Sequence, residues 1–168
     1  LPFWRRQDAA LSAPQLFANA LKRHGVDFLF GHSNPPALTM AAEDVGILQI
    51  GYRQENSGSY MADGYARATG KVPVVTAQNG PAATLLVPGL AECLSSSVPI
   101  VSLVQDVGPC TRDLHAFQVL DQLVLFKGVS KLVRRVTTAV CVEAYLHLSF
   151  TAAALRLPVP ASLLFSMC

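Results

Sequence analysis

Short apolar runs alternate with segments of helical periodicity along this chain of 168 residues, and this alternation limits the folds open to it. The apolar runs lie at residues 26–30, 47–52, 72–78, 98–104 and 131–136, with a last one within 156–166. Helical patterns occupy residues 12–25, 33–46, 55–69, 80–94 and 141–155. Continuous apolar strands that alternate with helices form parallel sheets covered on both faces. The sequence therefore predicts one α/β domain, a three-layer sandwich with a mostly parallel sheet.

The composition argues against several functional classes. Charged residues make up only 14% of the chain and the net charge is +2, which does not favour nucleic-acid binding. No apolar run approaches the roughly 18 residues of a membrane helix, and residues 1–15 lack a signal-peptide core, so we expect a cytoplasmic protein without a membrane partner. The four cysteines form no CxxC pair, which argues against a zinc site and a disulfide framework.

Polar residues and glycines follow the first four predicted strands. They are Gly31-His32, Glu55, Gln78-Asn79-Gly80 and Gln105-Asp106. Open parallel sheets bind ligands at the carboxyl ends of their strands, so we expect these loops to converge on one site. Glu55 is the lone carboxylate that precedes a helix rich in Gly, Ala and Tyr. From the residues alone it is either a ligand-binding group or an ordinary carboxylate stabilised by the helix dipole.

The segment YRQENSGSYMADGYARATGK, residues 52–71, resembles the one that carries the catalytic glutamate in thiamine-diphosphate-dependent enzymes, especially the acetolactate synthase group. Similar stretches occur in the family's order at residues 17–35, 76–93, 96–107, 115–122 and 156–165. The resemblance implies that residues 1–168 form a single N-terminal, pyrimidine-binding domain. The flavin-type middle domain and the diphosphate-binding domain of the family have no counterpart in these residues.

The resemblance implies roles for individual residues. Glu55 would bind the pyrimidine nitrogen remote from the thiazolium and share a proton with it, so that the neighbouring imino group removes the thiazolium C2 proton before attack on a 2-keto acid. Cofactor contacts are implied for Glu55, Gly31, His32, Asn79, Gly80 and Pro81. Substrate or partner-subunit contacts are implied for His32, Phe117 and Gln118. Two interpretations of Asn79 stay open, a ligand contact and a helix cap.

The family holds the cofactor's diphosphate through Mg²⁺ on a separate domain, marked by Gly-Asp-Gly and later asparagines. This chain has no Gly-Asp-Gly and no asparagine after Asn79, so we expect it to bind no metal itself. We also expect a fragment or truncated product that is inactive alone. Its partner would be the family's diphosphate-binding domain, in a homodimer or homotetramer, with residues 55–65 and 116–118 at the interface.

Several positions depart from the family pattern. Residues 32–36 replace a Tyr-Pro-Gly-Gly turn, residues 82–85 differ from the usual Gly-Ala-Thr-Asn, and Val119 stands where glutamate is common. The resemblance therefore leaves the substrate and FAD binding open. The leading hypothesis is half of an acetolactate synthase-like carboligase or 2-keto acid decarboxylase. The alternatives are a domain of a 2-hydroxyacyl- or oxalyl-CoA lyase, and a non-catalytic regulatory partner of a full-length relative.

Overall fold

The computed structural model describes residues 11–32, 34–111, 114–155 and 157–166, and within them six parallel strands form one sheet covered by six α-helices. The strands are β1 (Phe28–Gly31), β2 (Leu48–Gly51), β3 (Val74–Ala77), β4 (Val101–Gln105), β5 (Leu132–Val136) and β6 (Ala161–Phe165). The helices are α1 (Ala13–Arg23), α2 (Pro36–Asp44), α3 (Glu55–Thr69), α4 (Pro81–Ser95), α5 (Gln122–Lys127) and α6 (Val142–Ala154). The predicted fold class is confirmed.

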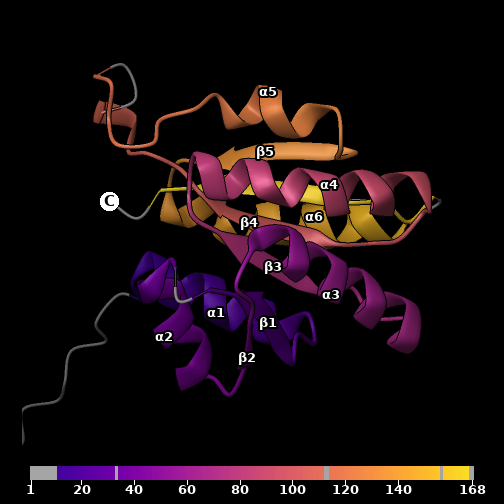
Figure 1. The fold of residues 1–168 in the computed structure, drawn as a ribbon. Helices are drawn as coiled ribbons and strands as arrows, with labels where there is room; N and C mark the ends of the chain where they lie inside the picture. Colours follow the sequence, from indigo (N-terminus) through magenta and orange to yellow (C-terminus); the bar gives the residue numbers. More distant parts are fainter. Residues whose placement is uncertain (1–10, 33, 112–113, 156, 167–168) are drawn as a thin grey trace, which may run out of the picture.

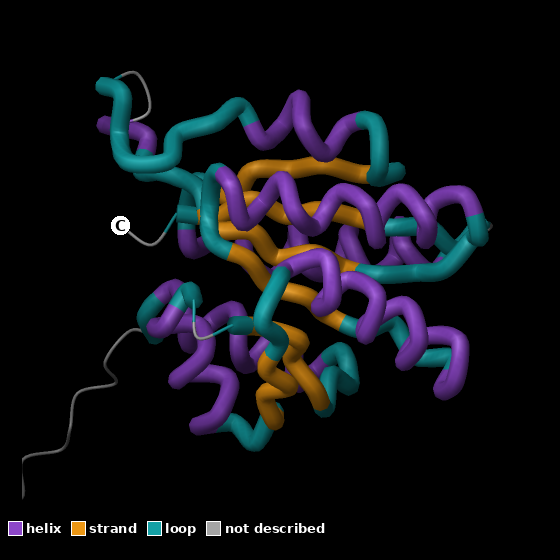
Figure 2. The backbone as a smooth tube through the Cα atoms, viewed as in Figure 1, coloured by secondary structure: helices purple, strands orange, loops and turns teal. Residues whose placement is uncertain are grey.

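The strands are arranged in the order β2-β1-β3-β4-β6-β5, and each neighbouring pair is parallel. Helices α1, α2 and α6 cover one face of the sheet, and α3, α4 and α5 cover the other (Figure 1). Because every strand runs in the same direction, all the carboxyl ends lie at one edge of the sheet. The tube in Figure 2 follows the loops that leave the strands there.

The burial of the strands explains why their sequences are continuously apolar. Every residue of β3 and β6 is buried, whereas β2, at one edge of the sheet, is half-buried or exposed. Side chains from the two faces of the sheet enter separate cores. The rings of Phe17 and Phe165 lie 4.8 Å apart in the core beneath α1, and Phe126 and Leu86 are fully buried in the core beneath α4 and α5.

Helix α5 is the element that the periodicity did not predict. It has six residues, QLVLFK, which is too short for an apolar stripe to repeat. Its start is nevertheless encoded, because the side chain of Asp121 accepts a hydrogen bond from the backbone N–H of Val124. In the described part of the chain, no helix is long and apolar enough to cross a bilayer.

Candidate functional site

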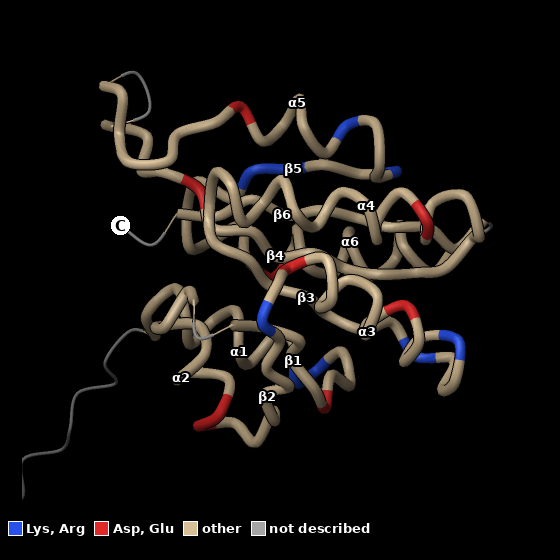
Figure 3. Tube along the Cα trace, viewed as in Figure 1, with Lys and Arg blue, Asp and Glu red and all other residues tan. Residues whose placement is uncertain are grey.

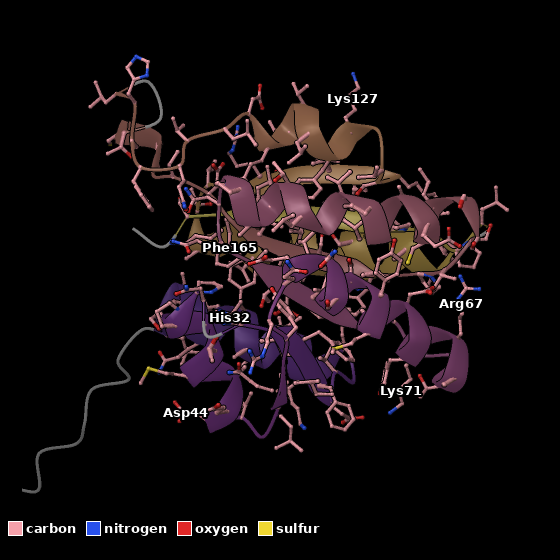
Figure 4. The ribbon with its side chains drawn as sticks, in the orientation of Figure 1. His32, Asp44, Arg67, Lys71, Lys127 and Phe165 are labelled. Carbon is pink, nitrogen blue, oxygen red and sulfur yellow. The ribbon has the colours of Figure 1, made fainter. Side chains whose placement is uncertain are left out.

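The residues that were predicted to form a site lie at the carboxyl edge of the sheet. Gly31 ends β1, Glu55 begins α3 after β2, and Asn79 to Pro81 join β3 to α4. Phe117 and Gln118 belong to the loop after β4, which we call the 107–121 loop. The order of the strands makes β2, β1, β3 and β4 consecutive neighbours, so these loops are adjacent. Figure 4 shows His32, just after β1, at the same edge as Phe165, the last residue of β6.

Glu55 is the first residue of α3 and is half-buried. The preceding Gln54 is the N-cap in an extended conformation, with φ −133° and ψ 143°, so the chain turns sharply from β2 into the helix. The positive end of the helix dipole favours a carboxylate at this position. Among the described residues, the Glu55 carboxylate takes part in no hydrogen bond or ion pair, which leaves its oxygens available to a ligand.

Tyr52 supports the start of this helix, a role that the sequence pattern did not reveal. Its side chain is buried, and its hydroxyl donates a hydrogen bond to the backbone oxygen of Thr76 on β3. Its ring lies against Gly58, where an added Cβ would come within 2.3 Å of a ring carbon. Burial raises the pKa of the Tyr52 phenol, and the nearby Glu55 carboxylate raises it further. A neutral phenol therefore lies close to the Glu55 carboxylate at all ordinary pH values.

Gly31 is the last residue of β1, the strand next to β2, and His32 follows it. A Cβ at Gly31 would come within 2.5 Å of Thr76 Oγ1, so this glycine allows β1 and β3 to pack closely. His32 is exposed, and its ring centroid is 6.1 Å from that of Tyr52. His32 and Gly31 therefore belong with Glu55 to one group of predicted residues.

A second group forms around the turn between β3 and α4. Gly80 has φ +67° and ψ −124°, a conformation that favours glycine, and a Cβ there would lie 2.5 Å from the backbone oxygen of Gln118. Asn79 is buried, and its Nδ2 donates to the backbone oxygens of Phe117 at 3.0 Å and Gln118 at 3.1 Å. The helix-cap interpretation of Asn79 is wrong, because Gly80 occupies the N-cap position of α4. A ligand contact by Asn79 stays a prediction.

The 107–121 loop and this turn line an open pocket of about 420 Å³, which we call the hollow. Its lining residues are Gly80, Pro81, Thr84, Gln118, Val119 and Leu120. The Oε1 atom of Gln118 is buried and has no hydrogen-bond partner in the described structure. Phe117 is 77% exposed. The hollow thus collects Gly80, Pro81 and Gln118, whereas Glu55 and His32 do not line it.

A hydrogen bond connects the loop after β1, which carries His32, with the turn between β3 and α4. The side chain of Asn34, which follows His32, donates through Nδ2 to Gln78 Oε1 at 3.4 Å, and Gln78 precedes Asn79. The structure therefore brings the predicted residues to one edge in two neighbouring groups. No set of three histidine, cysteine or acidic side chains suited to a metal ion occurs among the described residues.

A buried polar network that the sequence did not predict holds both ends of the 107–121 loop. Asp106 at the start of the loop forms an ion pair with Arg135 of β5, with Oδ2 2.5 Å from Nε. Gln122 at the end of the loop donates through Nε2 to Asp106 Oδ1 at 3.3 Å and to the backbone oxygen of Gln105 at 3.0 Å. The two ends of the loop are therefore tied to each other and to the sheet.

Comparison with known proteins gives a family match that covers both groups of residues. Residues 11–125 match the family described as thiamine pyrophosphate enzyme, N-terminal TPP binding domain. The acetolactate synthase large subunit of Parasynechococcus marenigrum is 38% identical over 117 residues, which are 66% of this chain and 19% of that protein. The acetolactate synthase isozyme 2 large subunit of Escherichia coli is 35% identical over 123 residues, 72% of this chain and 22% of that protein. The acetolactate synthase large subunit of Lactococcus lactis is 35% identical over 123 residues, 71% of this chain and 21% of that protein. The chain thus matches about a fifth of the length of these relatives.

Proposed function

The chain belongs to the thiamine pyrophosphate enzyme family, whose N-terminal cofactor-binding domain it matches, and we propose that it forms the pyrimidine-binding half of an acetolactate synthase-like active site. The complete enzyme would be a carboligase or decarboxylase that acts on a 2-keto acid in the cytoplasm. The position of Glu55 carries this proposal, because a half-buried carboxylate at the sheet edge begins α3 beside the neutral phenol of Tyr52.

The residues at this edge fit a flat aminopyrimidine. The Glu55 carboxylate forms no hydrogen bond or ion pair with another described residue and can bind a ring nitrogen. Toward the substrate, the buried Oε1 of Gln118 offers an acceptor for which the described residues supply no donor. Gly80 lines the hollow, and the absence of a side chain there allows the backbone of Gln118 to lie against the turn. Gly31, His32, Asn79 and Pro81 complete the set of cofactor contacts that we propose, with Phe117 and Gln118 toward the substrate.

Proton control is the chemistry that these residues can provide. Bound thiamine diphosphate supplies the electron sink for cleavage next to the keto acid's carbonyl group. Glu55 would hold a proton at a carboxylate oxygen and share it with the pyrimidine nitrogen, which sets the protonation state of the ring. The buried Tyr52 keeps its own proton and does not compete in this exchange, because burial raises its pKa.

The second half of the site would come from a diphosphate-binding domain of the same family, which holds the diphosphate through Mg²⁺, in a homodimer or homotetramer. The outer surface of α3 and α4 supports such a partner. Tyr60 and Met61 on α3 are 47% and 43% exposed, and Leu85 on α4 is 41% exposed. Figure 3 shows long stretches of both helices without charge, and Glu92 is the one charged residue of α4. Exposed apolar surface of this kind is typical of an interface.

The test is the substitution Glu55→Gln in a chain that carries this domain together with the diphosphate-binding domain. The amide keeps the shape of the side chain but cannot share a proton, so exchange of the thiazolium C2 proton should slow by about 10² or more. Deuterium exchange followed by acid quenching and NMR measures the rate. Glu43→Gln on the exposed part of α2 is the matched control and should exchange at the parent rate. A parent rate for Glu55→Gln would refute the assignment.

A further inference from the structure

We propose that Asn79 is a positioning residue that fixes Phe117 and Gln118 over the Gly80 turn, and so sets the shape of the hollow before any ligand binds. The inference rests on the proposed function for its catalytic meaning only, since the contacts themselves lie within this chain. Asn79 is 5% exposed, and its Nδ2 donates to two backbone oxygens of the 107–121 loop.

The chemistry of the contact fixes the orientation of the amide. The partners of Asn79 are two backbone carbonyl oxygens, those of Phe117 and Gln118, which only accept hydrogen bonds. Only the NH₂ end of the amide can satisfy both, because the carbonyl end would place three acceptors together. An asparagine therefore suits this position, and aspartate, which has the same shape but no donor when ionised, does not.

The loop needs such a contact because its backbone is strained where Asn79 binds it. Gln118 has φ +56° and His115 has φ +50°, left-handed values that non-glycine residues adopt only against a steric penalty. Gly80 allows the loop to approach, since a Cβ there would lie 2.5 Å from the Gln118 oxygen and 2.7 Å from its Cβ. The two hydrogen bonds from Asn79 act on the same backbone segment and offset this strain.

The backbone conformation of the loop determines where the side chains of Phe117 and Gln118 lie. Gln118 lines the hollow with its Oε1 buried, and Phe117 remains 77% exposed although its carbonyl oxygen is bound. Both directions follow from the backbone conformation that Asn79 stabilises. Asp106 and Gln122 tie the two ends of the loop, and Asn79 holds the backbone between them at Phe117 and Gln118.

Hydrogen–deuterium exchange of the free 168-residue chain tests the inference, with peptides that cover residues 114–121 as the readout. Asn79→Asp should lower the protection of this loop about 30-fold at pH 8, the effect of two net hydrogen bonds of ~1 kcal/mol each. Peptides from β3 and β4 should keep their protection. At pH 5 the introduced carboxyl, buried against two carbonyl groups, should regain a proton and one O–H donor, and protection should partly return after correction for the intrinsic exchange rate.

The matched control is Asn19→Asp on α1, which removes one amide donor to the backbone oxygen of Gln15 far from the loop. It should leave residues 114–121 as protected as in the parent chain. If Asn79→Asp raises exchange throughout β3 and β4, Asn79→Ala removes the same two donors without a charge, and the loop is compared again. Loop protection equal to that of the control, or no recovery at pH 5, overturns the inference. Because no ligand takes part, failure of the Glu55 assignment would leave this result standing, and the reverse also holds.

Discussion

The contact between Gly58 and Tyr52 gives a sharp test of how α3, and with it Glu55, is seated on the sheet. In Gly58→Ala the new Cβ would lie 2.3 Å and 2.4 Å from two ring carbons of Tyr52. The ring cannot easily turn away, because it is buried and its hydroxyl is bound to the backbone of β3. Overpacking of this kind costs about 1–3 kcal/mol.

Gly64→Ala is the matched control on the same helix. Gly64 is exposed, and nothing lies within 4 Å of a Cβ added there. Both substitutions gain the same helix propensity, about 0.5–1 kcal/mol, so the difference between them isolates the clash with Tyr52. Gly64→Ala should stabilise the chain, and Gly58→Ala should unfold at a temperature about 2–12 °C below it, at roughly 2–4 °C per kcal/mol for a chain of this size.

Thermal and urea unfolding followed by circular dichroism measure both effects. In the Tyr52→Leu background, which replaces the ring by a smaller side chain, the penalty of Gly58→Ala should largely disappear because the two changes share one contact. If Gly58→Ala proves as stable as Gly64→Ala in the parent background, the packing of Tyr52 beneath α3 is not as described, and the support that it gives to Glu55 fails with it.

Three further predictions concern the isolated chain. Calorimetry with thiamine diphosphate and Mg²⁺ should show binding no tighter than about 1 mM, roughly −4 kcal/mol. An activity assay should show no pyruvate consumption above the free-cofactor background. Micromolar binding that depends on Mg²⁺ would contradict the proposal that the chain forms half of the site. Burial raises the pKa of the Cys93 thiol from 9.0 to about 12, so iodoacetamide at pH 8 should modify the exposed Cys110 and spare Cys93 in the folded chain. Because the thiol ionises more easily in the unfolded chain, its contribution to stability is present below pH 9 and is lost as pH rises toward 12. Between pH 8 and pH 10.5, Cys93→Ala should therefore lose less stability than the parent chain. Urea unfolding at several pH values measures this difference.

The elements with a periodic or continuous apolar sequence pattern could be predicted from the sequence. The elements that depend on single contacts could not. The buried strands β3 and β4 are visible as apolar runs because both of their faces are covered. Gly70 marks the end of α3, and Gly80 marks the start of α4. Helix α5, with six residues, carries no such period.

The same distinction holds at the site. Glu55 could be predicted as a candidate because it lies within a continuous motif and begins a helix. The contact of Asn79 with Phe117 and Gln118 joins residues 38 and 39 positions apart, and no local pattern encodes it. Tyr52 and Gly58 are near in sequence, yet the need for glycine arises from the aromatic ring that packs against it, which only the folded structure reveals.

The network at Asp106 joins the candidate site to a part of the chain beyond the family match. The match ends at residue 125, but Asp106 within it is paired with Arg135 of β5, beyond that limit. The Asp106 carboxylate is only 2% exposed, and loss of Arg135 would remove the charged partner that joins it to β5. β5 in turn is held by β6, which pairs with β4 along its full length. The 107–121 loop, which carries Phe117 and Gln118, is therefore anchored through strands that follow it in the sequence. We therefore expect β5 and β6, as well as the matched residues, to be needed to hold this loop in place.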